Sequence, residues 1–284
     1  MLGDLELAPV YRWGQNFLID KTTFDRMADL VMEDRSQAQV LEIGPGVGGL
    51  TLSLLERGAD VVGLEIDSRF KRVLDTLADR YPGHLTVLYQ DALAGSWQDI
   101  LEHVGFDAAS IAGNLPYYAT APLMGCLLDL DYPWRRGVFM VQKEVAERLI
   151  AGPGHRNASV LSVLLRYRMD VVGGIGCVPA PRFWPAPEVS SAVIQLVRRK
   201  ELPVDWEVFR WVVRAGFAHR RKMLRQALAK APGSFLSKKA WSSLLNALGI
   251  GDSARAEELT LEQWVRMSGA LMDNRKGGAA YHDF

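Results

Sequence analysis

Three glycines, Gly44, Gly46 and Gly49, stand where an apolar run passes into a helical pattern. Residues 39–44 are typical of a buried strand, and residues 48–57 are typical of an amphipathic helix. Glycine at such a junction lets the backbone turn sharply and come close to a ligand. The junction therefore predicts a strand–loop–helix unit that binds a nucleotide-like group.

The same alternation of apolar runs and helical stretches continues to about residue 142. Near-continuous apolar strands separated by helices predict a parallel sheet that is covered by helices on both faces. Two later runs, 167–177 and 189–197, alternate polar and apolar residues and predict an antiparallel pair. The further expected strands are 60–65, 85–90, 108–113 and 137–142, and the further expected helices are 22–32, 68–80 and 119–128.

The pattern changes near residues 198–203, beyond which only helical stretches follow, at 206–218, 220–230, 238–248 and 261–271. We therefore expect an α/β, Rossmann-like, doubly wound domain at 1–198 and a small all-helical domain at 199–284. The net charge of zero hides an asymmetry. Residues 1–197 hold 17 Lys and Arg against 24 Asp and Glu, and residues 198–284 hold 16 against 9. A basic half of this kind indicates binding to a polyanion.

Several classes of protein are excluded by composition. No apolar run is long enough to cross a membrane, and the first ten residues lack the pattern of a secretory signal. The two cysteines, Cys126 and Cys177, are too few for a disulfide framework and lack metal-ligand spacing. We expect a cytoplasmic protein without a metal site.

The acidic residues after the strands distinguish between two nucleotide ligands. The glycines fit G-x-G-x-x-G, so a dinucleotide-dependent dehydrogenase is a competing hypothesis. Glu65 ends the second expected strand, where a carboxylate binds ribose hydroxyls of either ligand. Asp91 follows the third strand and is suited to an adenine amino group, while Glu42 inside the first strand needs a ligand amine or loop amides as its partner. Together these acids favour S-adenosylmethionine.

The sequence Asn114-Leu115-Pro116-Tyr117 follows the fourth strand and indicates the reaction. The lone pair of an adenine amine is delocalised into the ring, so two acceptors that bind its two hydrogens favour the reactive pyramidal form. Asn114 supplies an amide oxygen, and Pro116 supplies a carbonyl held outward in a stiff turn. Tyr117 offers a flat face for a base, and Phe183, in a second proline-rich loop, is suited to close the other face of a flipped base.

These motifs together resemble the KsgA family of small-subunit rRNA adenine dimethyltransferases, over residues 12–272. The resemblance rests on GQNFL (14–18), LEIGPGVGGLT (41–51), NLPY (114–117), QKEVAERL (142–149), the proline-rich segment 183–191, RRKMLR (220–225) and RAEEL (255–259). It departs from the family at Tyr118, where Asn is usual, and at residues 158–159, where Tyr-Gly is usual.

The resemblance implies roles for individual residues. Asn16 and Leu18 would border S-adenosylmethionine, Gly44 and Gly46 would contact it through the backbone, and Glu65 and Asp91 would bind its ribose and adenine. Asn114 would lie between cofactor and target amine, with Tyr117 and Phe183 on either side of the target adenine. The implied reaction is dimethylation of two adjacent adenosines in the 3′-terminal hairpin of small-subunit (16S) rRNA, within a pre-30S particle, by a monomer.

A basic cluster in the helical half is the candidate RNA-binding surface. Arg220, Arg221, Lys222 and Arg225 stand at an expected helix–helix corner with few acids nearby in the sequence. Such residues bind RNA phosphates through charge and shape. Two alternatives to the small-subunit enzyme stay open: a large-subunit rRNA adenine methyltransferase of the antibiotic-resistance type, and a largely non-catalytic ribosomal-subunit assembly factor.

Overall fold

The computed structural model describes residues 16–34, 38–219, 222–234 and 236–275. The chain divides into two compact units. The first unit comprises Met1–Glu147 and Val171–Arg198, and the second comprises Arg148–Asp170 and Arg199–Phe284. The second unit thus takes in an excursion of the chain, residues 148–170, that lies before the boundary expected near residue 198. This excursion adds four arginines and one aspartate to the second unit, and so makes that unit more basic.

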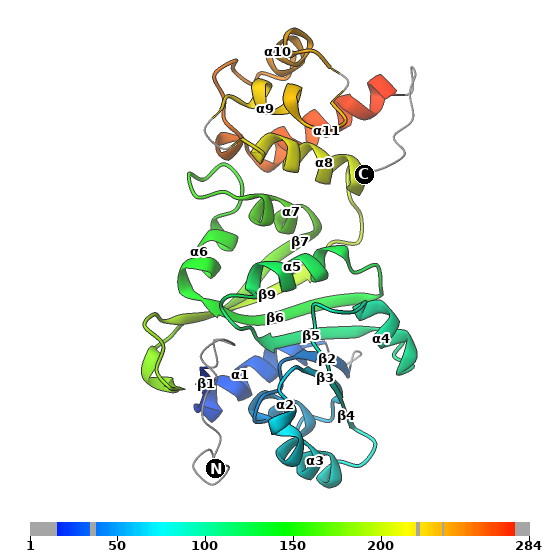
Figure 1. The fold of residues 1–284 in the computed structure, drawn as a ribbon, viewed down its shortest axis with the longest axis vertical. Helices are drawn as coiled ribbons and strands as arrows, with labels where there is room; N and C mark the ends of the chain where they lie inside the picture. The colour runs from blue at the N-terminus through cyan, green and yellow to red at the C-terminus, as the bar shows by residue number, and fades with distance from the viewer. Residues whose placement is uncertain (1–15, 35–37, 220–221, 235, 276–284) are drawn as a thin grey trace. The chain divides into compact units, whose positions relative to one another are not determined.

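A seven-stranded sheet, in the order β4-β3-β2-β5-β6-β9-β7, organises the first unit (Figure 1). The five strands from β4 to β6 are parallel, and β9 pairs antiparallel with β6. This confirms the doubly wound α/β class. The strands are β2 (Gln39–Ile43), β3 (Asp60–Glu65), β4 (Leu85–Tyr89), β5 (Ala109–Asn114), β6 (Trp134–Gln142), β7 (Met169–Val178) and β9 (Ser191–Arg198).

Helices of the first unit follow the strands as a doubly wound fold requires. Asp20 caps α1 by accepting the Thr23 amide, and Ser96 caps α4 by accepting the Asp99 amide. The helices are α1 (Lys21–Val31), α2 (Gly49–Leu55), α3 (Lys71–Arg80), α4 (Trp97–His103), α5 (Thr120–Asp129) and α6 (Lys143–Ala151), with short 3₁₀ turns at Ser68–Phe70 and Ala180–Arg182. The last residues of α6, from Arg148 on, belong to the second unit.

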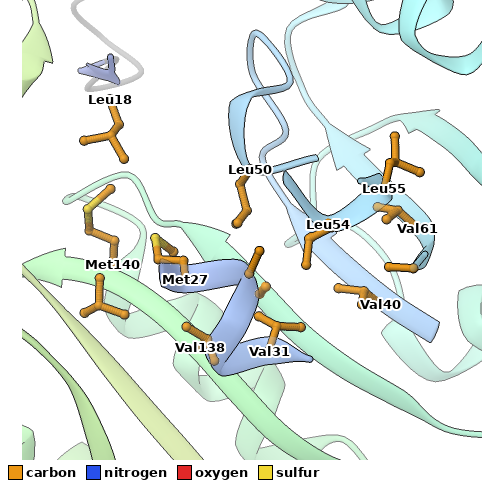
Figure 2. Packing of buried hydrophobic residues seen from close by; sticks show 14 of the residues in the cluster. Leu18, Met27, Val31, Val40, Leu50, Leu54, Leu55, Val61, Val138 and Met140 are labelled. Carbon is orange, nitrogen blue, oxygen red and sulfur yellow. The ribbon is translucent and has the colours of Figure 1, made fainter. Parts of the chain in front are cut away.

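The main apolar core lies between the sheet and two of these helices. Figure 2 shows Met27 and Val31 of α1 and Leu50 and Leu54 of α2 in one cluster of buried side chains with residues of β2, β3 and β6. Because burial of each such side chain contributes about 1.5–3 kcal/mol, this cluster fixes α2 against the sheet. The loop that precedes α2 is therefore held at both ends by packed structure.

A two-stranded sheet outside the main one joins distant parts of the chain. β1 (Phe17–Leu18) pairs antiparallel with β8 (Phe183–Trp184), so that Phe17 lies opposite Trp184 and Leu18 opposite Phe183. The Ile19 amide extends this pairing by donating to the Arg182 carbonyl at 2.8 Å. This pairing was not expected from the sequence, because two-residue strands carry no periodicity.

The second unit is helical, apart from the first two residues of β7. Tyr167 packs between α7 and α8, with its ring stacked 3.6 Å from the ring of Phe209. The Ser159 side chain and the Ser162 side chain form a capping box that starts α7. The helices are α7 (Val160–Arg168), α8 (Trp206–Phe217), α9 (Leu224–Lys230), α10 (Lys238–Ala247) and α11 (Leu261–Arg275), with a 3₁₀ turn at Ala256–Glu258.

Two elements in this part of the chain begin later than the sequence predicted. Residues 160–168 form α7, so the late strand begins at Met169 instead of residue 167, and α9 begins at Leu224. Tyr167 and Arg168, which were expected in the strand, form the end of the helix that the capping box of Ser159 and Ser162 starts. Over the described residues, the structure has no helix of the length and hydropathy needed to span a bilayer.

Candidate functional site: a cleft at the carboxyl ends of the strands

The cleft of the first unit lies where the sheet reverses its order. From β2 the chain adds strands outward to β4 and then crosses to the other side of β2 with β5, and ligands of doubly wound sheets bind at such a switch point. The cleft is lined by Asn16, Phe17, Leu18, Phe24, Glu42, Gly44, Pro45, Gly46, Val47, Gly49, Leu50, Glu65, Ile66, Phe70, Asn114, Leu115, Pro116, Tyr117, Tyr118 and Phe183.

The predicted glycine loop lines this cleft, and its glycines have different roles. Gly44 has φ +71° and Gly46 has φ +56°, conformations that disfavour any other residue. A Cβ on Gly44 would project into open space, with no atom of the described chain within 4 Å. A Cβ on Gly49 would instead lie 2.3 Å from the ring of Phe24, so this glycine allows α2 to pack closely on α1.

Glu65 joins the end of β3 to the glycine loop. Its side chain is buried, and its two oxygens accept the Gly46 amide at 2.7 Å and the Asp67 amide at 2.8 Å. Burial raises the pKa of Glu65, and these two amides oppose that shift. A carboxylate has about four lone-pair positions, so positions remain for the hydroxyls of a ribose.

Glu42 is a second buried carboxyl in the cleft. The sequence led us to expect a ligand amine or loop amides as its partner, but the partner in the chain is the Thr51 hydroxyl, which donates to it at 2.7 Å. Burial raises the pKa of Glu42 to about 8, and the nearby charge of Glu65 adds to the shift. Glu42 is therefore largely protonated at neutral pH.

Asp91, the predicted partner of the adenine amino group, lies near Tyr118 of the cleft lining. Its side chain is exposed after β4, and its Oδ1 accepts the Leu93 amide at 2.8 Å, forming a local turn. Among the described residues that line the cleft, Asp91 is absent. Its assignment to the adenine amino group stays a prediction.

Asn114 is the last residue of β5 and lines the cleft together with the glycine loop. Its Nδ2 donates to the Asn16 carbonyl at 3.5 Å, which leaves Oδ1 as an acceptor on the side of a ligand. The predicted N-terminal residues Asn16 and Leu18 line the same cleft. The structure thus brings together residues that are nearly one hundred positions apart.

The expectation for the Pro116 carbonyl is corrected by the structure. That oxygen accepts the Ala119 amide at 3.0 Å and the Thr120 hydroxyl at 3.2 Å, because it begins the turn into α5. The Leu115 carbonyl accepts no hydrogen bond within the described part of the chain, and Leu115 lines the cleft. Sequence reasoning missed Leu115, since only the hydrogen bonds of the turn show which carbonyl is engaged.

Two predicted aromatic residues, Tyr117 and Phe183, also line the cleft. The Tyr117 hydroxyl lies 2.8 Å from the Ser191 hydroxyl, and burial raises the pKa of Tyr117. Phe183 is buried and is held by the pairing of β8 with β1. Both predicted aromatic residues line the cleft, which gives flat apolar surfaces suited to a base.

The basic cluster of the second unit is described only in part. Arg220 and Arg221 lie outside the described residues, and Lys222 is exposed. Arg225 donates through Nε to the Asp252 carbonyl at 3.1 Å and lies 4.0 Å from the Asp252 carboxylate. The fold therefore brings to Arg225 an acid that is distant in sequence. The role of Arg225 in RNA binding stays a prediction.

The lining fits S-adenosylmethionine. Gly44 leaves open space where a side chain would stand, and the buried carboxylate of Glu65 has lone-pair positions left for ribose hydroxyls. No cluster of metal-ligand side chains occurs among the described residues. The fold and the cleft define an S-adenosylmethionine-dependent methyltransferase of the Rossmann-like class.

Comparisons with known proteins identify the family. A family model described as ribosomal RNA adenine dimethylase matches residues 11–273. The chain is 39% identical over 277 residues to "Ribosomal RNA small subunit methyltransferase A" of Cutibacterium acnes, covering 93% of this chain and 89% of that protein. The protein of the same name from Anaeromyxobacter sp. is 39% identical over 282 residues, 95% and 96% of the two chains. The chain belongs to the ribosomal RNA adenine dimethylase family.

Solved structures support the same fold. The 23S rRNA methyltransferase ErmE is 26% identical, with a TM-score of 0.70 over 90% of this chain and 100% of that one. A dimethyladenosine transferase from Plasmodium falciparum has a TM-score of 0.70 at 24% identity, over 89% and 96% of the two chains. Membership of the family excludes the dehydrogenase hypothesis for the glycine loop.

Proposed function

We propose that this protein dimethylates the exocyclic amines of two adjacent adenosines in the 3′-terminal hairpin of small-subunit rRNA. It acts as a monomer, in the cytoplasm, on partly assembled small subunits. The relatives that carry the small-subunit name are 39% identical to this chain, whereas the large-subunit enzyme ErmE is 26% identical. This difference favours the small subunit as the substrate.

One observation carries the chemistry: Asn114, Tyr117 and Phe183 line the same cleft as the glycine loop. When bound, S-adenosylmethionine supplies a methyl group on an electrophilic sulfonium. The two aromatic residues hold the unstacked target adenine by its faces. Asn114 Oδ1 and the Leu115 carbonyl accept the two amine hydrogens, which favours the pyramidal amine and directs its lone pair along the cleft.

These groups act mainly by position and electrostatics. In each transfer one N–H bond of the amine is replaced by an N–CH₃ bond, the S–CH₃ bond of the sulfonium breaks to leave S-adenosylhomocysteine, and one proton is released to solvent. After the second transfer the amine has no hydrogen for Asn114 or Leu115 to accept. The loss of both hydrogen bonds favours release of the dimethylated base, which is a physical reason for the reaction to stop there.

The second unit supplies the electrostatic attraction for RNA. It holds 19 Lys and Arg against 10 Asp and Glu, whereas the first unit holds 14 against 23. Phosphate contacts by a basic unit position an RNA without reading its sequence. Lys222 is exposed and suited to this role, together with Arg220 and Arg221 of the same basic cluster.

The test uses labelled S-adenosylmethionine, undermethylated small subunits and separate large subunits, followed by mapping of the modified nucleotides. The wild-type protein is expected to label two adjacent adenosines of the small subunit. Asn114→Ala is expected to lose transfer, with an affinity for the cofactor that calorimetry finds within about threefold of wild type. Label on the large subunit would indicate the ErmE-like activity, and unlabelled subunits that still bind the protein would indicate an assembly factor.

A further inference from the structure

Tyr118 is an exposed aromatic residue at the mouth of the cleft. Its side chain is 58% exposed, and it lines the cleft next to Tyr117. Its hydroxyl makes no hydrogen bond with the part of the chain that the structure describes. Exposure of a large aromatic ring to water is unfavourable, so a ring beside a binding site is a candidate contact for a ligand.

The backbone presents this ring from a rigid turn. On one side the Leu115 amide donates to the Met140 carbonyl of β6 at 3.0 Å. On the other side the Ala119 amide and the Thr120 hydroxyl both donate to the Pro116 carbonyl. Because the backbone that carries the ring is already fixed, a partner that stacks on the ring orders only the side chain.

The charge of the first unit limits how it can hold a nucleic acid. With 14 basic against 23 acidic residues, this unit repels a phosphate backbone overall. Asp91 adds a negative charge close enough to Tyr118 to help raise the pKa of its hydroxyl, after the larger effect of partial burial. Contacts to uncharged bases are therefore favoured over contacts to phosphates at this position.

We propose that the ring of Tyr118 stacks on the base next to the target adenosine in the RNA strand. The inference rests on the proposed function, because it requires an RNA adenine in the cleft. A phosphodiester backbone keeps the neighbouring nucleotide at the cleft mouth when the target base lies inside between Tyr117 and Phe183. Tyr118 thus binds a second, flanking base and positions the strand for transfer.

Substitutions of Tyr118 test the stacking. An unmethylated RNA hairpin with two adjacent adenosines in its loop serves as the probe, and its Kd is measured at several salt concentrations. Base–aromatic stacking predicts that Tyr118→Ala weakens binding by about 5- to 100-fold, with an unchanged salt slope. Tyr118→Phe and Tyr118→Trp are expected to keep wild-type affinity, and Tyr118→Leu is expected to recover only part of it.

Two further measurements make the result decisive. Val172→Ala removes an apolar side chain of similar exposure from β7 of the same unit and is expected to leave the Kd unchanged. The affinity of Tyr118→Ala for S-adenosylmethionine without RNA is expected to match wild type. A weaker cofactor affinity would assign the ring to the cofactor, and equal RNA affinity of Tyr118→Ala and wild type would make it an ordinary surface residue; either result overturns the inference.

These experiments give different results if this inference is wrong and if the proposed function is wrong. If the wild-type protein neither binds nor methylates the hairpin or the small subunit, the proposed function fails and the inference fails with it. If the wild-type protein is active and Tyr118→Ala equals it in Kd and turnover, only the inference fails.

Discussion

The Gly46 amide donates a 2.7 Å hydrogen bond to the carboxylate of Glu65, which joins the glycine loop after β2 to the end of β3. One oxygen of Glu65 fixes the loop, and the other accepts the Asp67 amide. The carboxylate that is expected to bind ribose therefore also shapes the loop that contacts the cofactor. A change at Glu65 is therefore expected to affect both the shape of the glycine loop and the binding of the cofactor.

Glu65→Ala is expected to lower both stability and cofactor affinity. The substitution leaves two amides without their acceptor. Each amide that stays buried then lowers the free energy of unfolding by about 1–3 kcal/mol. It also removes the acceptor for ribose, so we expect at least a tenfold weaker affinity for S-adenosylmethionine by calorimetry. Glu102→Ala serves as the control, because this exposed carboxylate accepts a hydrogen bond from Gln98 within α4 and is not among the residues that line the cleft in the described chain. Wild-type affinity in Glu65→Ala would contradict the assignment.

Gly44→Ala is expected to weaken cofactor binding through the atom that it adds. Gly58 is a matched control, since its φ of +80° is also left-handed and a Cβ there likewise meets no atom within 4 Å. Each alanine introduces roughly 1–2 kcal/mol of backbone strain, so both variants should unfold at similarly lowered temperatures. Only Gly44→Ala places its Cβ in the cleft, and only this variant is expected to bind S-adenosylmethionine less tightly. Equal affinity of the two variants would show that the ligand lies away from Gly44.

Glu42→Gln is expected to change how stability depends on pH. The folded protein raises the pKa of Glu42 from an ordinary value of 4.5 to about 8. Protons therefore bind the folded state more tightly, so the free energy of unfolding of the wild type falls as pH rises from 4.5 and levels off above about 8. Glutamine does not titrate, so the Tm of Glu42→Gln relative to wild type should increase over this interval. A constant difference in thermal melts between pH 5 and pH 9 would contradict the raised pKa.

The two basic residues Lys222 and Arg225 are expected to respond differently to charge reversal. Arg225→Glu breaks the contact with Asp252 and places two acids together, so it should lower the Tm. Lys222→Glu reverses an exposed charge, so it should leave the Tm nearly unchanged and weaken RNA binding with a shallower salt dependence. Melting curves and RNA titrations at several salt concentrations measure both effects. An unchanged salt slope in Lys222→Glu would remove this residue from the RNA surface.

Local patterns were sufficient to predict the strands, the glycine loop and the residues after each strand. Parallel strands end at one edge of a sheet, so Glu65 and Asn114 were expected in one site and both line the cleft. The pattern was not sufficient at the start of the late strand, where Tyr167 and Arg168 belong to α7, the helix that Ser159 caps. Two-residue strands such as β1 and β8 have no period to detect.

The order of residues along the chain by itself determined the class of fold, the family and most of the residues around the cofactor cleft. These depend on periodicity and short motifs, which a single segment contains in full. Only the tertiary structure decided the partner of Glu42, the engaged carbonyl of Pro116 and the pairing of Arg225 with Asp252. Each of these is a hydrogen bond whose two groups meet through the path of the chain, and no local pattern specifies that path.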